Sequence, residues 1–195
     1  GWLRNMLKPL RTDNRIGVVG PLSNTASWQS IPYVEENGDW KNNTIPDSLN
    51  LNTFADTLHY LMPRQYAEVG FINGFCMLIR RETINDIGIF DEDTFGRGYG
   101  EENDFCLRAY KNKWKLCVCM QAYVFHSQSK SYSDERRMKL SQHADQLLEA
   151  KHGRALKQQQ LACTMTHPML LFGRSASQSA EAFYIALEAI KNKFK

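Results

Sequence analysis

GYGEENDFCLRAYKNKWKLCVCM, residues 98–120, contains a helix and a strand in direct succession. Residues 101–111 predict a helix, because acidic side chains occupy its first turn, where they interact favourably with the helix dipole. Residues 114–120 are mostly apolar and predict a strand that places Cys117 and Cys119 on one face. Outward from this stretch strands and helices alternate along the chain, which predicts an α/β fold.

The remaining elements follow from apolar periodicity and from turn residues. Further strands are predicted at residues 16–20, 66–71, 75–79 and 123–125, and further helices at residues 2–10, 47–60, 82–87, 134–152 and 180–193. Pro9 is expected to bend or weaken the first helix. Asn73-Gly74 predicts a turn or a local distortion between two strands, and it allows one antiparallel neighbour pair. Residues 90–99 predict a loop, and residues 157–168 form a connector of undefined structure.

Composition excludes several classes of protein. The 195 residues are 43% hydrophobic and 23% charged, which is typical of a globular chain. No apolar run is long enough for a membrane span, and a net charge of +3 does not support nucleic-acid binding. The five cysteines form no CxxC pair, and the first residues lack the apolar core of a signal peptide. Free thiols in a reducing cytoplasm are therefore expected.

The densest chemical signal is the start of the helix at residues 101–111. Glu101, Glu102 and Asp104 follow two glycines, and Arg108 lies four residues after Asp104. A carboxylate at such a junction of loop and helix suits a general base that deprotonates a hydroxyl. The alternative is that these acids only cap the helix and favour its dipole.

Two further groups have both a functional and a structural interpretation. His126 ends a predicted strand and precedes Ser129 and Lys130, so it could bind a divalent metal while its neighbours meet a phosphate. A histidine at a strand end is also a common structural residue. Trp28 and Trp40 lie in a polar loop, where they could stack on a sugar or fix the loop to the core.

Four blocks of the sequence resemble glycosyltransferase family 2, in particular its rhamnosyltransferase-like members. The blocks are RIGVVGPLSNTASWQSIP (15–32), INGFCMLIRRETINDIGIFDE (72–92), GYGEENDFCLRAYKNKW (98–114) and AYVFHSQSKSY (122–132), and they follow in the family's order. The resemblance covers residues 1–152. It implies a GT-A-like fold, with a mixed sheet and flanking helices, and transfer of a sugar from a nucleotide-diphosphate donor to an acceptor hydroxyl with inversion by single displacement.

The resemblance also implies a role for each matching residue. Glu102 corresponds to the catalytic base, Glu101 and Asp104 to supporting residues, Trp28, Asn73 and Gly74 to the acceptor side, His126 to the metal position, and Ser129 and Lys130 to the diphosphate segment. The cofactor implied is Mg²⁺ or Mn²⁺. The partners implied are a nucleotide-sugar donor and a carbohydrate or lipid-linked acceptor. This chemistry suggests polysaccharide biosynthesis in the cytoplasm, at the inner face of the membrane through peripheral association.

The sequence departs from the family at its start. Family members have a nucleotide-binding half that ends in an Asp-rich motif shortly before a Gly-Trp-Leu such as residues 1–3, and nothing here matches that half. We therefore expect residues 1–153 to be the acceptor and base portion, inactive alone and prone to self-association, and residues 154–195 to be a helical extension. The alternative function is a non-catalytic carbohydrate-binding or assembly module derived from such an enzyme.

Overall fold

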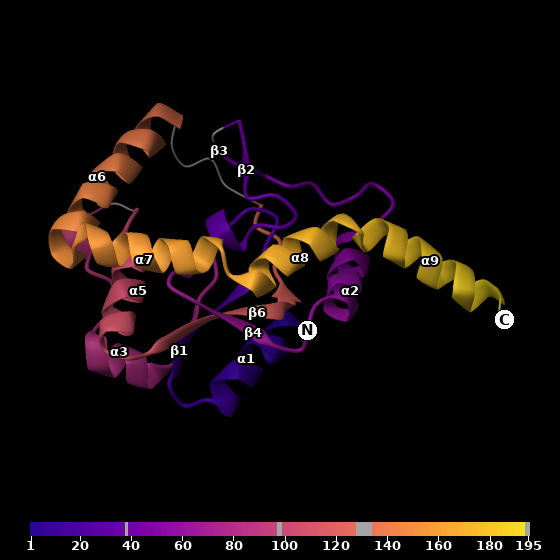
Figure 1. The fold of residues 1–195 in the computed structure, drawn as a ribbon, viewed down its shortest axis with the longest axis horizontal. Coiled ribbons are helices and arrows are strands. Elements are labelled where there is room, and N and C mark those ends of the chain that lie inside the picture. Colours follow the sequence, from indigo (N-terminus) through magenta and orange to yellow (C-terminus); the bar gives the residue numbers. More distant parts are fainter. Residues whose placement is uncertain (38, 97–98, 128–133, 194–195) are drawn as a thin grey trace.

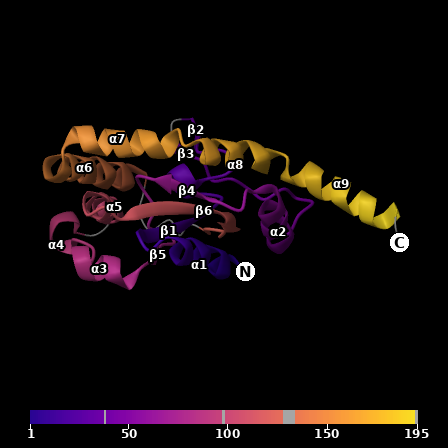
Figure 2. The ribbon, with the colours of Figure 1, turned by 60° about the horizontal axis from the view of Figure 1, so that its bottom comes forward.

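A computed structural model describes residues 1–37, 39–96, 99–127 and 134–193. Its centre is a mixed four-stranded sheet in the order β4-β6-β1-β5 (Figures 1 and 2). The inner strands β1 (Ile16–Leu22) and β6 (Lys115–Tyr123) run parallel, and both edge strands run antiparallel to their neighbours. Helices flank this sheet, so the prediction of an α/β protein with a mixed sheet is confirmed.

The two edge strands, β4 (Tyr66–Val69) and β5 (Leu78–Ile79), lie at opposite sides of the sheet. The antiparallel neighbour pair that Asn73-Gly74 allowed between them is therefore not formed. The segment between them crosses the sheet, because its Ile72 is fully buried over Gly20 of β1. A Cβ on Gly20 would lie 2.7 Å from Ile72 Cγ2, so the crossing requires glycine at this position.

The two faces of the sheet are covered by different helices. Along β6, the side chains of Leu116, Val118 and Met120 enter the main core, whereas Cys117 and Cys119 pack in a smaller cluster beneath α1 (Trp2–Thr12). The prediction that these two cysteines share a face is thus confirmed. Figure 2 shows α1 on one side of the sheet and the C-terminal helices on the other.

Most of the predicted helices form close to their expected bounds. The elements between β1 and α7, apart from the strands already given, are η1 (Ser27–Gln29), a small hairpin of β2 (Glu35–Glu36) and β3 (Asp39–Trp40), α2 (Leu51–Leu61), α3 (Arg81–Ile87), α4 (Glu92–Phe95), α5 (Glu101–Lys111) and α6 (Asp134–His152). Several local differences remain. The strand predicted at residues 75–79 is confined to the two residues of β5, helix α4 forms within the predicted loop at 90–99, and β6 is one strand where the sequence predicted two.

The expected connector at residues 157–168 is helical. Gly153, with φ at +88°, separates α6 from α7 (Arg154–Met165), and Pro168 opens α8 (Pro168–Gln178). Helix α7 packs tightly on the sheet, because the backbone N–H of Gly70 donates to Thr164 Oγ1 at 2.9 Å. Helix α9 (Ala180–Lys193) packs on α2 and extends away from the rest of the structure (Figure 1). No helix in the described ranges is long and apolar enough to span a bilayer.

Candidate functional site

A cleft of about 1020 Å³ lies on the face of the sheet opposite α1. Its walls come from η1, the crossing segment, the start of α5, the residues after β6, α6 and α7. The residues that line it include Ser27, Trp28, Trp40, Phe71, Asn73, Glu102, His126, Asp145, Leu148, Glu149, Arg154 and Lys157. Four of the predicted site residues, Trp28, Asn73, Glu102 and His126, therefore lie around one cavity although up to 98 positions separate them.

Glu102 is positioned by close packing at the start of α5. Gly100, with φ at +97°, begins this helix in a conformation that favours glycine, and a Cβ there would lie 2.9 Å from Ala144 of α6. Gly74 approaches Glu102 from the crossing segment, and a Cβ on it would lie 3.3 Å from Glu102 Cβ. The predicted residue Gly74 thus lies directly against the stem of Glu102.

The environment of Glu102 makes its carboxylate a stronger base than a free glutamate. Burial raises the pKa of Glu102, the negative charge of Glu101 raises it further, and backbone hydrogen bonds at the helix start oppose both effects. Glu101 itself has one buried carboxylate oxygen, Oε2, without a hydrogen-bond partner among the described residues. Burial and the charge of Glu101 together therefore favour the protonated form of Glu102, which is what makes its carboxylate the stronger base.

Asp104 lies outside the cleft lining and binds helix α6. Its buried carboxylate contacts Arg108 Nε at 2.7 Å, Lys151 Nζ at 2.8 Å and His152 Nε2 at 2.7 Å. Burial opposes ionisation of Asp104, but the hydrogen bonds from Lys151, His152 and Arg108 outweigh it and lower the pKa. Since α6 forms one wall of the cleft, Asp104 supports the site by holding that wall.

His126 presents one ring nitrogen that the described chain does not use. Its Nδ1 lies 2.9 Å from the carbonyl oxygen of Thr25, which can only accept, so Nδ1 is the donor of this hydrogen bond. Its ring stacks on Phe75 with the centroids 5.0 Å apart. Among the described residues no group of three metal-binding side chains exists, so His126 does not complete a metal site with them. Ser129 and Lys130 lie outside the described residues.

The two tryptophans play different structural parts. Trp28 is 8% exposed and packs on Phe71 with ring centroids 5.4 Å apart, which fixes its loop to the core. Trp40 is 39% exposed and meets Trp28 edge to face at 6.4 Å. Trp28 Nε1 is buried and has no partner in the described part of the chain. The cleft therefore has a fixed aromatic wall that continues into an exposed one.

Comparison with known proteins finds no similar protein. No protein-family model matches the chain, and neither a curated protein nor a solved structure matches it.

Several residues of the site were missed by the sequence analysis. Gln29 is fully buried beneath the cleft, where its Nε2 donates to the carbonyl of Pro21 and its Oε1 accepts from the backbone of Asn73, each at 2.6 Å. The only feature of the sequence that pointed to Gln29 was its position next to Trp28 in the block at residues 15–32. Gln29 thus connects β1 to the crossing segment and fixes Asn73, whose Nδ2 donates to Ser27 Oγ at 3.1 Å.

Helix α7 contributes a second set of residues that the sequence did not suggest. Lys157 Nζ lies 2.7 Å from Asp145 and 2.6 Å from Glu149, both on α6. Arg154 also lines the cleft. The polar composition of residues 157–160 hid the helix, and no local pattern showed that it would face α6.

Proposed function

We propose that the cleft is the acceptor site of an inverting glycosyltransferase of GT-A type that resembles family 2. The observation that carries the proposal is the carboxylate of Glu102, which lines the cleft and has a raised pKa. A mixed sheet with flanking helices is compatible with such a fold. The presence of Trp28, Asn73 and His126 around the same cavity supports the proposal, because the resemblance implied these positions independently of their distances.

In the proposed reaction Glu102 accepts the proton of an acceptor hydroxyl. The oxygen then attacks the anomeric carbon of the donor sugar, and the bond from this carbon to the diphosphate oxygen breaks. The electron pair of that bond leaves with the nucleoside diphosphate, and the single displacement inverts the configuration. A base with a raised pKa is well matched to a hydroxyl, since proton transfer becomes more favourable as the base strengthens.

The resemblance also implies Mg²⁺ or Mn²⁺, which would neutralise the leaving diphosphate. The described residues do not fit a complete site for this ion, since no three metal-binding side chains among them lie close enough together to hold it. The role proposed for Glu102 does not depend on this ion.

A carbohydrate-binding or assembly module is the second candidate. The aromatic wall of Trp28 and Trp40 favours it, because aromatic rings supply apolar contact area beside polar groups. In such a module Glu102 would be dispensable, and the aromatic residues would determine affinity. The two candidates therefore differ in what happens when a single carboxylate is neutralised.

The test compares Glu102→Gln with Glu82→Gln, an exposed glutamate in the first turn of α3. Sugar transfer is measured with the complete polypeptide that the gene encodes, and oligosaccharide binding is measured by NMR titration of this chain. A catalytic base predicts a loss of turnover on the order of 10²-fold or more in Glu102→Gln, with acceptor binding retained. Unchanged turnover in that variant would exclude the base assignment. Saturable binding that needs Trp40, with no turnover in the unmodified protein, would favour the module.

A further inference from the structure

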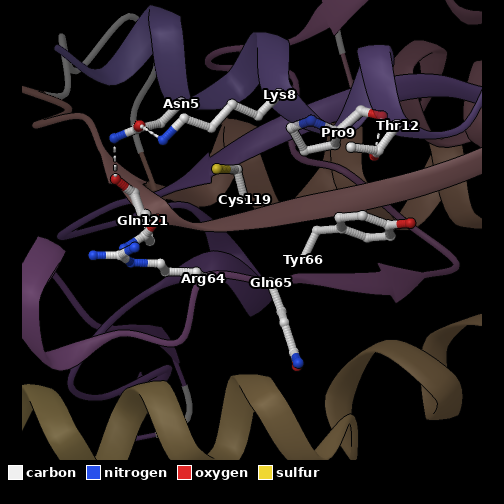
Figure 3. A pocket seen from close by; sticks show the side chains of 9 residues that line it. All are labelled: Asn5, Lys8, Pro9, Thr12, Arg64, Gln65, Tyr66, Cys119 and Gln121. Carbon is white, nitrogen blue, oxygen red and sulfur yellow. Dashed lines mark hydrogen bonds between the residues drawn. The ribbon is translucent and has the colours of Figure 1, made fainter.

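A second pocket, of about 380 Å³, lies on the opposite side of the sheet from the cleft. It is formed by α1, by the segment that enters β4 and by β6 (Figure 3). Its lining is Asn5, Lys8, Pro9, Thr12, Arg64, Gln65, Tyr66, Cys119 and Gln121. This volume is within the range of sites for small molecules. None of these residues belongs to the cleft, so the pocket has no part in the function proposed above.

The pocket carries positive charge without a compensating acid. Lys8 and Arg64 line it, and within the described chain no Asp or Glu does. Neither cation forms an ion pair with a described acidic residue. The ammonium of Lys8 donates to Asn5 Oδ1 at 2.8 Å, and the guanidinium of Arg64 has no hydrogen-bond partner in the same part of the chain. Several charged donors are therefore available to an anion.

Lys8 is held in place by a buried amide. Asn5 is 9% exposed, and its Nδ2 donates to the carbonyl of Gln121 at 2.9 Å while its Oδ1 accepts from Lys8. Figure 3 shows this chain of hydrogen bonds from Lys8 through Asn5 to Gln121. An ammonium positioned by a bonded neighbour loses less conformational freedom on binding than a free lysine does.

The rest of the pocket combines the apolar surfaces of Pro9, Tyr66 and Cys119 with the polar side chains of Thr12, Gln65 and Gln121. In Figure 3 the ring of Pro9 and the ring of Tyr66 lie toward one end, whereas the Lys8 ammonium and the Arg64 guanidinium lie toward the end near Gln121. Burial raises the pKa of the Cys119 thiol, which is therefore neutral and acts as an apolar part of the floor. The pocket thus separates a cationic end from an apolar slot bordered by an aromatic ring.

We propose that this pocket binds a small organic anion whose phosphate or carboxylate group meets Lys8 and Arg64 and whose flat apolar body lies against Tyr66. A simple inorganic anion would leave the apolar slot unfilled, and a neutral aromatic compound would leave the two cations without a partner. The class of ligand is consequently an aryl or similarly flat phosphate or carboxylate.

The test uses phenyl phosphate, benzoate, inorganic phosphate and benzyl alcohol as probes, with NMR titration of the unmodified chain. We expect saturable shifts at the backbone amides of Tyr66 and Cys119 with both aromatic anions. Inorganic phosphate and benzyl alcohol should each bind at least about tenfold more weakly than the aromatic anions, because each makes only one half of the contacts. Equal affinity for inorganic phosphate, or for benzyl alcohol, would overturn the proposal.

Variants decide whether these two cations are responsible. Lys8→Gln and Arg64→Gln should each raise the dissociation constant for phenyl phosphate by about tenfold, the loss of one charge-assisted contact. Arg4→Gln is the matched control, because it removes an exposed charge from the same helix outside the pocket. Both pocket residues are exposed, so the variants are expected to fold, and far-ultraviolet circular dichroism checks this. Unchanged affinity in both variants, or an equal loss in Arg4→Gln, would refute the proposed site.

Discussion

The guanidinium of Arg174, on α8, donates from Nη2 to the backbone carbonyl of Trp28 at 2.8 Å across 146 residues of sequence. Its Nη1 donates to the carbonyl of Met165 at the end of α7, at 3.3 Å. Its Nε is buried without a hydrogen-bond partner in the described part of the chain. One side chain of the C-terminal helices therefore fixes the loop that forms the aromatic wall of the cleft.

Replacing this side chain should loosen the wall. Arg174→Ala removes both hydrogen bonds and leaves the carbonyl of Trp28 unpaired, so we expect a loss of about 1–3 kcal/mol in the free energy of unfolding. The indole N–H resonance of Trp28 should shift, while those of Trp2 and Trp114 stay in place. Arg81→Ala, which removes an exposed arginine from α3, is the control and should leave all three unchanged. An unshifted Trp28 resonance in Arg174→Ala would contradict this role.

Asp104 should be the residue on which the attachment of α6 depends most strongly. Asp104→Asn leaves Lys151 and Arg108 without their buried carboxylate partner, and we expect a loss on the order of 3 kcal/mol at neutral pH. Amide hydrogen exchange should become faster in α6 before it does in β6. Asp91→Asn removes only the partly exposed second partner of Lys151 and should cost little. Comparable losses in the two variants would show that the burial of Asp104 is unimportant.

The same residue predicts a direction for pH dependence. The pKa of Asp104 is lowered from 3.8 in the folded state, so its contribution to stability is present above that value. The contribution is lost as the pH falls through the lower, folded-state pKa. Urea denaturation of the unmodified protein and of Asp104→Asn at a series of acidic pH values should therefore converge. Parallel curves down to the most acidic pH would exclude the linkage.

Glu102 predicts the opposite dependence. Its pKa is raised above 4.5 in the folded state, so its contribution to stability is complete below that pH and is lost as the pH rises through the folded-state pKa. At pH 7 the free energy of unfolding of Glu102→Gln should consequently exceed that of the unmodified protein by on the order of 1 kcal/mol. The variant should therefore unfold at a higher temperature. The gain should shrink toward pH 4. The control Glu82→Gln should not show this dependence of stability on pH. A stability gain in Glu102→Gln that does not change with pH would rule out the burial of Glu102 as its cause.

Gly70 should tolerate no side chain. A Cβ there would lie 2.5 Å from both Cβ and the backbone oxygen of Gln160 on α7, so the helix itself must move. We expect Gly70→Ala to cost about 1–3 kcal/mol and to increase hydrogen exchange in α7. Gly74→Ala is the comparison, because its nearest neighbours are side-chain atoms of Glu102 at 3.3 Å, which have some freedom to shift. A smaller loss in Gly70→Ala than in Gly74→Ala would contradict the packing described for α7.

Local signals predicted the centre of the fold. The acidic first turn of α5 and the alternation around Cys117 and Cys119 depend on neighbouring residues, and α5 formed as predicted, whereas the strand formed but continues to Tyr123. The grouping of Trp28 and Glu102 in one cleft came from a resemblance, since no periodicity in the chain reports their distance.

What the sequence could not supply was pairing between distant segments. Asn73-Gly74 allowed an antiparallel pair between neighbouring strands, but burial of Ile72 over Gly20 accompanies a chain that crosses the sheet instead. The partners of Asp104 at Lys151 and His152 lie more than forty residues away, so only the Arg108 contact was visible in advance. The polar surface of α7 likewise concealed a helix that packs against the sheet through Gln160 and Thr164.

The segment between β4 and β5 crosses the sheet and forms part of the cleft wall. This part of the wall therefore connects the two edges of the sheet. It is bonded at Asn73 to Gln29 and is packed at Gly74 on Glu102, while its ends continue into strands that do not touch each other. Displacing either edge strand must therefore strain the crossing segment, and movement of the crossing segment must displace both edge strands. We expect the cleft and the sheet margins to open as one cooperative unit, so that the geometry around Glu102 persists for as long as the sheet is intact.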